Sequence, residues 1–390
     1  MKKTKVGLIF LVLALGLALI MTGCGGKDTG KASAPAGGEK VIKVGFVGPL
    51  TGDVQTFGES TKNGFYLALE QAGYKAGDYK IEPVIADDKN DAQEAFNVGT
   101  KLITQDKVKA IVGSVTSKAT IPISDLANSN KVVMITGTAT NEKVTVADGK
   151  RKDYIFRACF IDPFQGTVDA KFALENLKAK KAAVLYDQGN DYTIGLANYF
   201  KDGFTKGGGE IVAFEAYSKD DKDFSAVLTN IAKKDIDVLF LPDYYQKVNV
   251  IAKQAREKGI NAKIVGGDGW DSKDLDFATL DGGYFTSHSS ADDPRPEVKA
   301  FVEQYKAKYN AKPDAFATLS YDATKLLLNA IKTANSDDPA KIREAMQNTK
   351  DFSVVSGKIS FDANGNPIKP ATILQVKKDG TYGFVANIQP

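Results

Sequence analysis

Short apolar runs alternate with amphipathic segments through most of the chain, beginning at Val41. Each short run has the length of a buried β-strand, and each amphipathic segment repeats apolar residues every three or four positions, as one face of an α-helix does. This alternation is typical of a parallel sheet with helices on its faces. The strands predicted in this way are Val41–Val47, Ile81–Ile85, Val108–Val112, Val132–Ile135, Ala182–Tyr186, Ile211–Tyr217, Val238–Leu241 and Ile264–Val265.

The strand–helix alternation runs twice, over two units of similar length, Val41–Cys159 and Phe160–Phe285. After Phe285 the order changes to helices followed by strands. Pro339 follows two aspartates, which is a strong signal for the start of a helix. The predicted elements of this last part are the helices Val298–Tyr305, Ala323–Ile331 and Ala340–Met346 and the strands Phe352–Phe361 and Thr372–Val376.

The N-terminus carries a targeting pattern. Three lysines precede the apolar run Val6–Met21, which is shorter than the ~20 residues that a transmembrane helix needs. We therefore predict a secretory signal peptide over residues 1–23. Cys24 follows small residues, and this junction resembles the lipobox of bacterial lipoproteins, which implies a lipid anchor on Cys24; the alternative is ordinary secretion with an incidental cysteine. Residues 24–40, rich in Gly, Ala and Ser, are predicted to form a flexible tether.

Composition narrows the function classes. The 390 residues include 51 basic and 48 acidic ones, and the excess of three equals the lysines of the predicted signal peptide. Such a balanced chain is not expected to bind nucleic acid. With one histidine and two cysteines, the sequence has too few ligands for a His-rich or Cys-rich zinc site and no disulfide framework. No metal and no cofactor is predicted.

Enzyme signatures are missing from the sequence. It contains no G-x-x-x-x-G-K-[ST] phosphate loop, no G-x-S-x-G elbow and no H-E-x-x-H, and the segment after the first strand lacks G-x-G-x-x-G spacing. His288 lies in a small polar stretch and is predicted to be a loop or strand-end residue. Cys159 is predicted to be a small buried residue. The Asp/Asn-rich segment Asp362–Asn366 has its glycine at the wrong position for a calcium loop and is predicted to be a turn. We predict no catalytic residue.

Small hydroxyl residues cluster where three strands of the first unit end, at Gly48–Gly52, Gly113–Ser117 and Thr136–Thr140. Open α/β sheets bind ligands at the carboxyl ends of their strands. Small residues let a ligand approach the backbone, and hydroxyls together with the free N–H groups of a following helix suit a small anion such as a carboxylate. The alternative is that these residues only cap helices; three successive clusters favour a site.

The second unit supplies complementary groups. Asp268 follows a predicted strand and can pair with a cation, and Tyr192, Tyr244 and Trp270 also follow strands. An acid with aromatic neighbours suits an ammonium group beside an apolar side chain. The two units together therefore predict an amino acid held between two lobes.

At this point the chain resembles the type I periplasmic binding proteins of the branched-chain amino acid group, which serve ABC transporters. The resemblance covers nearly all of Val41–Pro390. Its markers, in order, are Val44–Gly52, Ile111–Ser117, Met134–Asn141, Gly266–Trp270 and Leu319–Ala323.

The resemblance implies an α/β fold of two doubly wound parallel-sheet lobes joined by a hinge of three crossovers. It places one lobe at residues 41–159 plus 288–371 and the other at 160–287 plus 372–390. The implied crossovers lie near Cys159–Phe160, Phe285–His288 and Ala371–Thr372. The late helices would then return to the first lobe.

The family pattern also implies roles for single residues. Ser117 and Thr140 would bind the ligand's α-carboxylate, and the carbonyl of Thr138 and the acid Asp268 would take its α-ammonium. The full set of predicted ligand-binding residues is Phe57, Val115, Thr116, Ser117, Thr138, Ala139, Thr140, Tyr192, Tyr244, Asp268 and Trp270. Leucine-type members place Glu where Asp268 stands and a small apolar residue where Thr138 stands, so these departures bear on side-chain preference.

The function implied is an extracytoplasmic, lipid-anchored monomer that captures a branched-chain or other small apolar or hydroxylated amino acid by lobe closure. It would deliver this ligand to an ABC permease driven by an ATPase, would touch the membrane only through its anchor and would not be an enzyme. Three alternatives stay open: the same fold binding an amide, urea or aromatic acid, a secreted α/β enzyme, and a surface adhesin or sensor.

Overall fold

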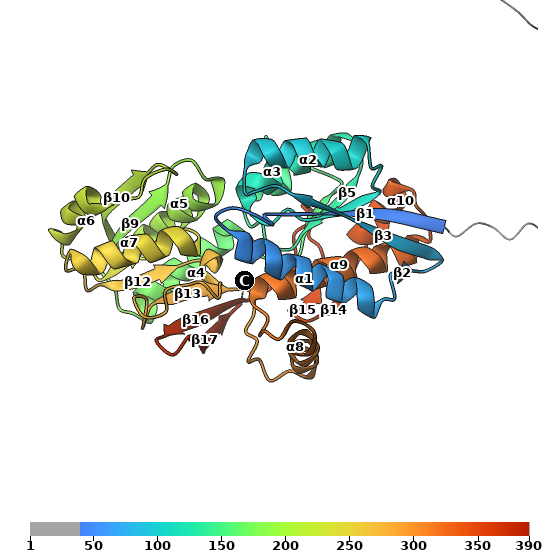
Figure 1. The fold of residues 1–390 in the computed structure, drawn as a ribbon. Coiled ribbons are helices and arrows are strands. Elements are labelled where there is room, and N and C mark those ends of the chain that lie inside the picture. The colour runs from blue at the N-terminus through green and yellow to red at the C-terminus, as the bar shows by residue number, and fades with distance from the viewer. Residues whose placement is uncertain (1–39, 390) are drawn as a thin grey trace, which may run out of the picture. The chain divides into compact units, whose positions relative to one another are not determined.

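Two separate, mostly parallel sheets organise the residues that the computed structural model describes, 40–389 (Figure 1). The predicted signal peptide, Cys24 and the predicted tether lie outside the described residues, apart from Lys40, which begins the first strand. Within the described range no helix has the length and apolar character needed to cross a bilayer.

The first sheet has six strands and matches the first predicted unit. Its members are β1 (Lys40–Gly48), β2 (Lys75–Ala76), β3 (Tyr79–Asp87), β4 (Ala110–Val112), β5 (Val133–Thr136) and β8 (Ile155–Arg157). Their order is β2-β3-β1-β4-β5-β8, and all neighbours run parallel except β2, which pairs antiparallel with β3. The four strands predicted for this unit are confirmed.

Helices cover both faces of this sheet (Figure 1). One face carries α1 (Gln55–Gln71) and α9 (Ala315–Ala334), and the other carries α2 (Ala92–Thr104) and α3 (Ser117–Ser129). Strand β1 alternates between the two cores, since Ile42, Val44 and Phe46 pack with α1 and α9 whereas Val47 packs with α2 and α3. A strand buried on both faces needs this pattern.

The second sheet has seven strands in the order β10-β9-β11-β12-β13-β16-β17. These are β9 (Lys181–Asp187), β10 (Glu210–Tyr217), β11 (Val238–Phe240), β12 (Lys263–Gly266), β13 (Tyr284–Ser287), β16 (Ala371–Lys377) and β17 (Thr381–Ile388). The first five run parallel, whereas β16 and β17 are antiparallel additions at one edge. The helices of this part are α4 (Asp162–Glu175), α5 (Asp191–Lys206), α6 (Ser225–Ala232) and α7 (Tyr245–Glu257).

The remaining elements are short or peripheral. They are the helices α8 (Pro296–Tyr309) and α10 (Pro339–Gln347), the 3₁₀ turns η1 (Glu142–Val144) and η2 (Asp268–Trp270), and the short strands β6 (Val146–Ala147), β7 (Lys150–Arg151), β14 (Phe352–Val354) and β15 (Gly357–Ile359). The single strand predicted over Phe352–Phe361 is wrong, because the chain turns at Val355–Ser356 and pairs β14 with β15. The turn predicted at Asp362–Asn366 is present, with the Asp362 carboxylate accepting the backbone N–H groups of Asn364 and Asn366.

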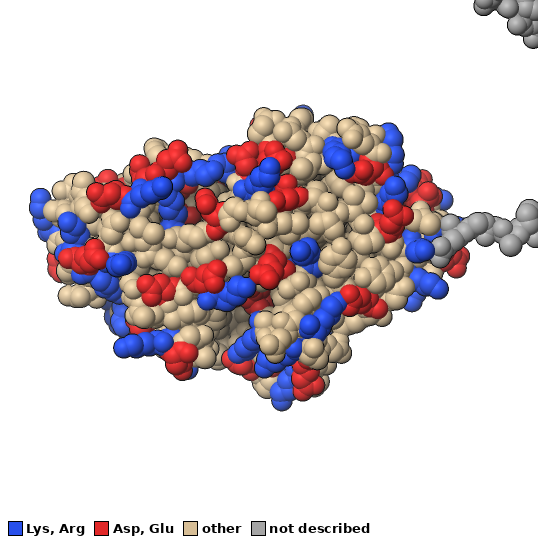
Figure 2. Space-filling model, viewed as in Figure 1, with Lys and Arg blue, Asp and Glu red and all other residues tan. Residues whose placement is uncertain are grey.

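The chain passes between the two sheets three times. It leaves the first sheet after β8, returns after β13 to build α9 against α1, and enters the second sheet again at β16. This order is compatible with the three predicted crossovers, while the lobe boundaries themselves stay a prediction. On the face drawn in Figure 2, basic and acidic side chains are interspersed, in keeping with the balanced composition.

Candidate functional site

Most of the predicted site residues lie just beyond the carboxyl ends of parallel strands. Ser117 begins α3 after β4, and Thr140 lies in the loop after β5. Tyr192, Tyr244 and Asp268 follow β9, β11 and β12 in the same way. All five side chains are buried. Both sheets therefore contribute strand ends to the candidate site.

Hydrogen bonds between two loops shape the part of the site that comes from the first sheet. The Thr138 hydroxyl donates to the carbonyl of Val115 over 2.6 Å, and the Ser117 hydroxyl accepts the backbone N–H of Asn141 over 3.2 Å. The loop after β4 is thus fixed to the loop after β5. The Thr116 hydroxyl donates to the side-chain oxygen of Asn90 over 2.8 Å, which occupies it with a structural bond.

Asp268 is the acidic centre of the part that comes from the second sheet. Its side chain is only 6% exposed, and its Oδ2 lies 3.2 Å from Nε2 of His288. Its other oxygen, Oδ1, has no hydrogen-bond partner in the part of the chain that the structure describes. An unpaired carboxylate oxygen is costly in a buried position, so Oδ1 is suited to receive a cationic hydrogen-bond donor.

Close packing fixes the backbone in front of Asp268. A Cβ atom on Gly267 would lie 2.5 Å from Nε2 of Gln165 and 2.6 Å from the Tyr192 hydroxyl. Only glycine allows that approach. The same Tyr192 hydroxyl accepts the backbone N–H of Gly269 over 3.2 Å, which holds the η2 turn against α5.

Aromatic rings from both sheets meet beside these polar groups. Phe57 stacks on Phe316 with 4.0 Å between ring centroids, and it meets the edge of Tyr244 at 5.8 Å. Tyr244 in turn stacks on Tyr192 at 5.2 Å. Val115 packs into the same cluster. These rings form an apolar wall that joins α1 and α9 to α5 and α7.

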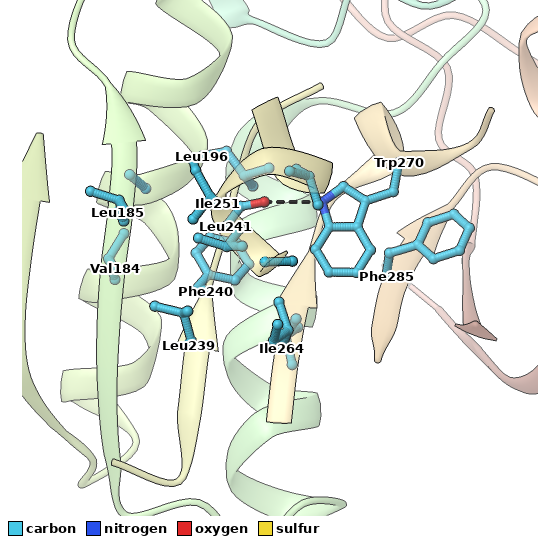
Figure 3. Packing of buried hydrophobic residues seen from close by; sticks show 14 of the residues in the cluster. Val184, Leu185, Leu196, Leu239, Phe240, Leu241, Ile251, Ile264, Trp270 and Phe285 are labelled. Atoms are coloured by element: carbon cyan, nitrogen blue, oxygen red, sulfur yellow. Dashed lines mark hydrogen bonds between the residues drawn. The ribbon is translucent and has the colours of Figure 1, made fainter. Parts of the chain in front are cut away.

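Two predicted site residues point elsewhere. Trp270 is buried in the core of the second sheet, where its indole N–H donates to the carbonyl of Leu241 over 3.0 Å and its ring packs beside Phe285 (Figure 3). Gly266 makes room for this ring, since a Cβ there would lie 2.2 Å from the indole. The side chain of Ala139 packs in the core under α2 and α3. Both side chains are core residues. Their orientation could not be predicted, because a position in a loop does not determine which way a side chain points.

Arg157 is a residue of the site region that was not predicted from the sequence. Its side chain is fully buried at the end of β8, and it donates to the carbonyls of Ala139 and Asn141 over 2.9 and 3.0 Å and to the Thr145 hydroxyl over 3.1 Å. It therefore shapes the loop that carries Thr138 and Thr140. No strand was predicted at Ile155–Arg157, so the apolar pattern did not mark this arginine.

Helix α4 brings three further polar residues that the sequence reasoning missed, Asp162, Gln165 and Asp169. All three are buried on one face of the helix, and each keeps at least one side-chain polar atom without a partner among the described residues. Burial raises the pKa of Asp162 to about 8, although hydrogen bonds from Thr140 and Asn141 oppose the rise. The detectable signal was a stripe of polar residues spaced three and four positions apart, which begins at the residue before Pro163.

These raised pKa values predict the pH dependence of stability. Burial also raises the pKa of Asp243 to about 7. The folded state then holds protons that the unfolded state, with carboxyl pKa values near 4, has released, so stability falls as the pH rises toward the folded-state values. We expect Tm to fall between pH 6.5 and 8. His288 has the opposite effect on stability, but because its pKa is lowered it loses most of its proton below this window.

Differential scanning calorimetry at several pH values checks this expectation. Asp162→Asn mimics the protonated acid and should flatten the fall in Tm, whereas replacing the exposed Asp220 should leave the slope unchanged. An unaltered slope in Asp162→Asn would show that Asp162 is ionised in the folded protein.

Direct contacts also join the elements packed on the first sheet to those packed on the second. The hydroxyls of Thr56 and Ser272 lie 3.0 Å apart, and Lys273 pairs with Glu59 over 3.0 Å. On another edge Asn141 donates to the carbonyl of Asp191 over 2.9 Å. Each of these contacts joins an element packed on the first sheet to one packed on the second.

The chain is similar in sequence to known periplasmic binding proteins. Residues 41–381 match the family described as periplasmic binding protein. The leucine-, isoleucine-, valine-, threonine- and alanine-binding protein of Pseudomonas aeruginosa is 31% identical over 330 residues, which are 83% of this chain and 87% of that protein.

Two solved structures are similar over nearly their whole length. The leucine-binding protein LivK of Thermotoga maritima is 36% identical, with a TM-score of 0.85, and the match covers 90% of this chain and 99% of that one. The branched-chain amino acid transporter substrate-binding protein LivJ of Streptococcus pneumoniae, solved with isoleucine, is 35% identical, with a TM-score of 0.83 and coverage of 90% and 100%.

Proposed function

Because the chain belongs to the periplasmic binding protein family, we propose that it is an extracytoplasmic substrate-binding protein that delivers a branched-chain amino acid to an ABC transporter. The observation that carries the proposal is the buried Oδ1 atom of Asp268, which has no partner among the described residues and belongs to a carboxyl group that acts electrostatically with Tyr192 and Tyr244 of the aromatic wall. The relatives described above are binding proteins, which supports a role in binding rather than in catalysis.

The site chemistry suits a zwitterion with an apolar side chain. Asp268 would pair with the ammonium group, since a buried cation needs a buried counter-charge. Ser117, Thr140 and the N–H groups at the start of α3 would bind the carboxylate. The side chain of the ligand would lie against Phe57 and Tyr244, where apolar contact is available.

Binding would couple to closure of the two halves. A zwitterion that contacts both sets of loops favours the arrangement in which they meet, so it shifts the population toward the closed form. The contacts Thr56–Ser272 and Lys273–Glu59 would be made in that form. The closed protein would then dock on a permease driven by an ATPase, as a monomer held at the membrane by a lipid on Cys24.

An aromatic acid, amide or urea is the second candidate ligand. A relative of known structure at 27% identity was solved with 3,4-dihydroxybenzoic acid, and its match covers 90% of this chain at a TM-score of 0.81. Such a ligand lacks the ammonium group and would leave Oδ1 of Asp268 without a cation, so the geometry favours an amino acid.

Thermal unfolding with added ligands tests the proposal. A ligand that binds only the folded state stabilises it by about 2.7 kcal/mol when present at a hundred times its Kd. Leucine, isoleucine and valine should each raise Tm by several degrees, whereas benzoate and urea should not. The protein should first be denatured and refolded, and the released small molecules identified by mass spectrometry, because a bound ligand that co-purifies would mask the shift. No shift with any amino acid after refolding would overturn the proposal.

A further inference from the structure

His288 connects the acidic centre of the site to the passages between the sheets. It is the one histidine of the sequence, and it lies directly after β13, where the chain leaves the second sheet. Its ring packs on Phe160 with 3.7 Å between centroids and 31° between planes. Phe160 belongs to the first passage, between β8 and α4. One buried imidazole therefore touches two of the three passages and Asp268.

The hydrogen-bonding pattern fixes the state of this imidazole. Burial lowers the pKa of His288, although Asp268 opposes the change, so the ring is neutral near pH 7. A neutral imidazole carries one N–H group. Nε2 faces a carboxylate oxygen and Nδ1 has no partner in the described residues, so the hydrogen is on Nε2 and is donated to Oδ2 of Asp268.

This donation divides the two oxygens of Asp268 between two tasks. Oδ2 accepts the hydrogen of the imidazole, whereas Oδ1 is buried and has no partner within residues 40–389. Lys369, in the third passage, is the other charged group that acts on His288. The titratable groups that act electrostatically with Asp268 are Cys159, Asp162, Asp169, Tyr192, Tyr244 and Asp271. Among these groups the imidazole is the one whose hydrogen bond to Asp268 the structure records.

We propose that His288 is a positioning residue for ligand binding, which donates its Nε2 hydrogen to Oδ2 of Asp268 and so directs Oδ1 toward the ammonium group of the ligand. The inference rests on the proposed function, since it assigns the ammonium to Asp268. His288 lies in the second passage between the sheets. This passage would therefore take part in recognising the ammonium group, through the orientation of Asp268.

The state of the imidazole can be measured without any ligand. In ¹⁵N-labelled protein the only imidazole signals outside the affinity tag, which must be removed, come from His288. They should show the Nε2–H form, should report a pKa below the ordinary value near 6.5, and should shift in the Asp268→Asn variant. A protonated Nδ1, or a titration near pH 6.5, would overturn the proposal even if the protein binds no amino acid at all.

Variants test the positioning role. His288→Phe keeps a ring against Phe160 and removes the donor, so it should raise Kd for leucine roughly tenfold to a hundredfold, the size of a hydrogen bond to a charged group. His288→Gln retains an N–H donor of similar reach and should recover most of the affinity. Ser289→Ala, next in the chain and partly exposed, is the matched control and should bind normally.

A ligand without the amino group separates positioning from simple loss of packing. The affinity for 4-methylpentanoate, the des-amino analogue of leucine, should be equal in the wild type and in His288→Phe. An equal loss for both ligands would assign His288 a structural role and overturn the proposal. If the wild type binds no amino acid, the proposed function fails, and the tautomer measurement still decides whether His288 orients Asp268.

Discussion

Replacing Asp268 by alanine should raise the Kd for leucine or isoleucine by roughly a hundredfold or more. Removing one partner of a buried ion pair costs about 3–5 kcal/mol, because the other charge stays buried without compensation, and each 1.4 kcal/mol is a factor of ten. Here the stranded charge would be the ammonium group of the ligand. Isothermal titration calorimetry on refolded protein measures the effect.

Two controls make this result specific to the ammonium. Asp274→Ala removes an exposed carboxyl group six residues further along the chain and should leave affinity unchanged. The des-amino ligand 4-methylpentanoate should bind Asp268→Ala no more weakly than it binds the wild type, since it has no ammonium group that the missing carboxylate would leave unpaired. Near-normal leucine affinity in Asp268→Ala would remove this residue from the site.

Replacing Arg157 by methionine should destabilise the protein by about 3 kcal/mol or more. The change fills a similar volume but removes the donors for two carbonyls and one hydroxyl, and each buried acceptor left unsatisfied costs about 1–3 kcal/mol. In a protein of this size Tm should fall by roughly 5 °C or more. Because Arg157 holds the loop of Thr138 and Thr140, leucine affinity should fall as well.

Arg343→Met on α10 is the matched control for this variant. Arg343 is partly exposed and lies over the ring of Tyr154 at 5.9 Å, so its loss should change Tm by no more than a degree or two. Arg157→Lys should be intermediate, since an ammonium group lacks the planar fork that reaches three acceptors at once. A Tm equal to that of the wild type in Arg157→Met would show that the loop holds its shape without these hydrogen bonds.

The regular part of the fold could be predicted because its signal is local. Strands β1, β3, β4 and β5 and helix α8 follow from apolar spacing, and Pro339 adds the start signal of α10; β2 and β8 were not predicted. Helix α4 gave no such stripe, because Asp162, Gln165 and Asp169 occupy positions on its buried face. Strand β17 is partly exposed along its length and ends the sheet, so its pattern lacks a continuous apolar run. Both were missed for the same reason: tertiary context decides their burial.

The candidate site was also predicted only in part. The loops after β4, β5 and β12 could be located, since parallel strands bring their carboxyl ends to one edge. The contacts of single side chains could not. Asp268 and His288 meet only because the chain turns from η2 through β13, and no spacing rule predicts that approach. Trp270, two residues from Asp268, points into the core because a glycine beneath it leaves space for the indole.

Because the chain passes between the two sheets three times, both sheets depend on residues from late in the sequence. The first sheet gains α9 only after residue 334, and the second sheet gains β16 and β17 from the last twenty residues of the described range. Such long-range pairings close large loops and slow the acquisition of structure. Neither sheet can therefore be completed before the C-terminal part of the chain has been made. That delay would suit the proposed extracytoplasmic role, since an exported chain crosses the membrane before it folds.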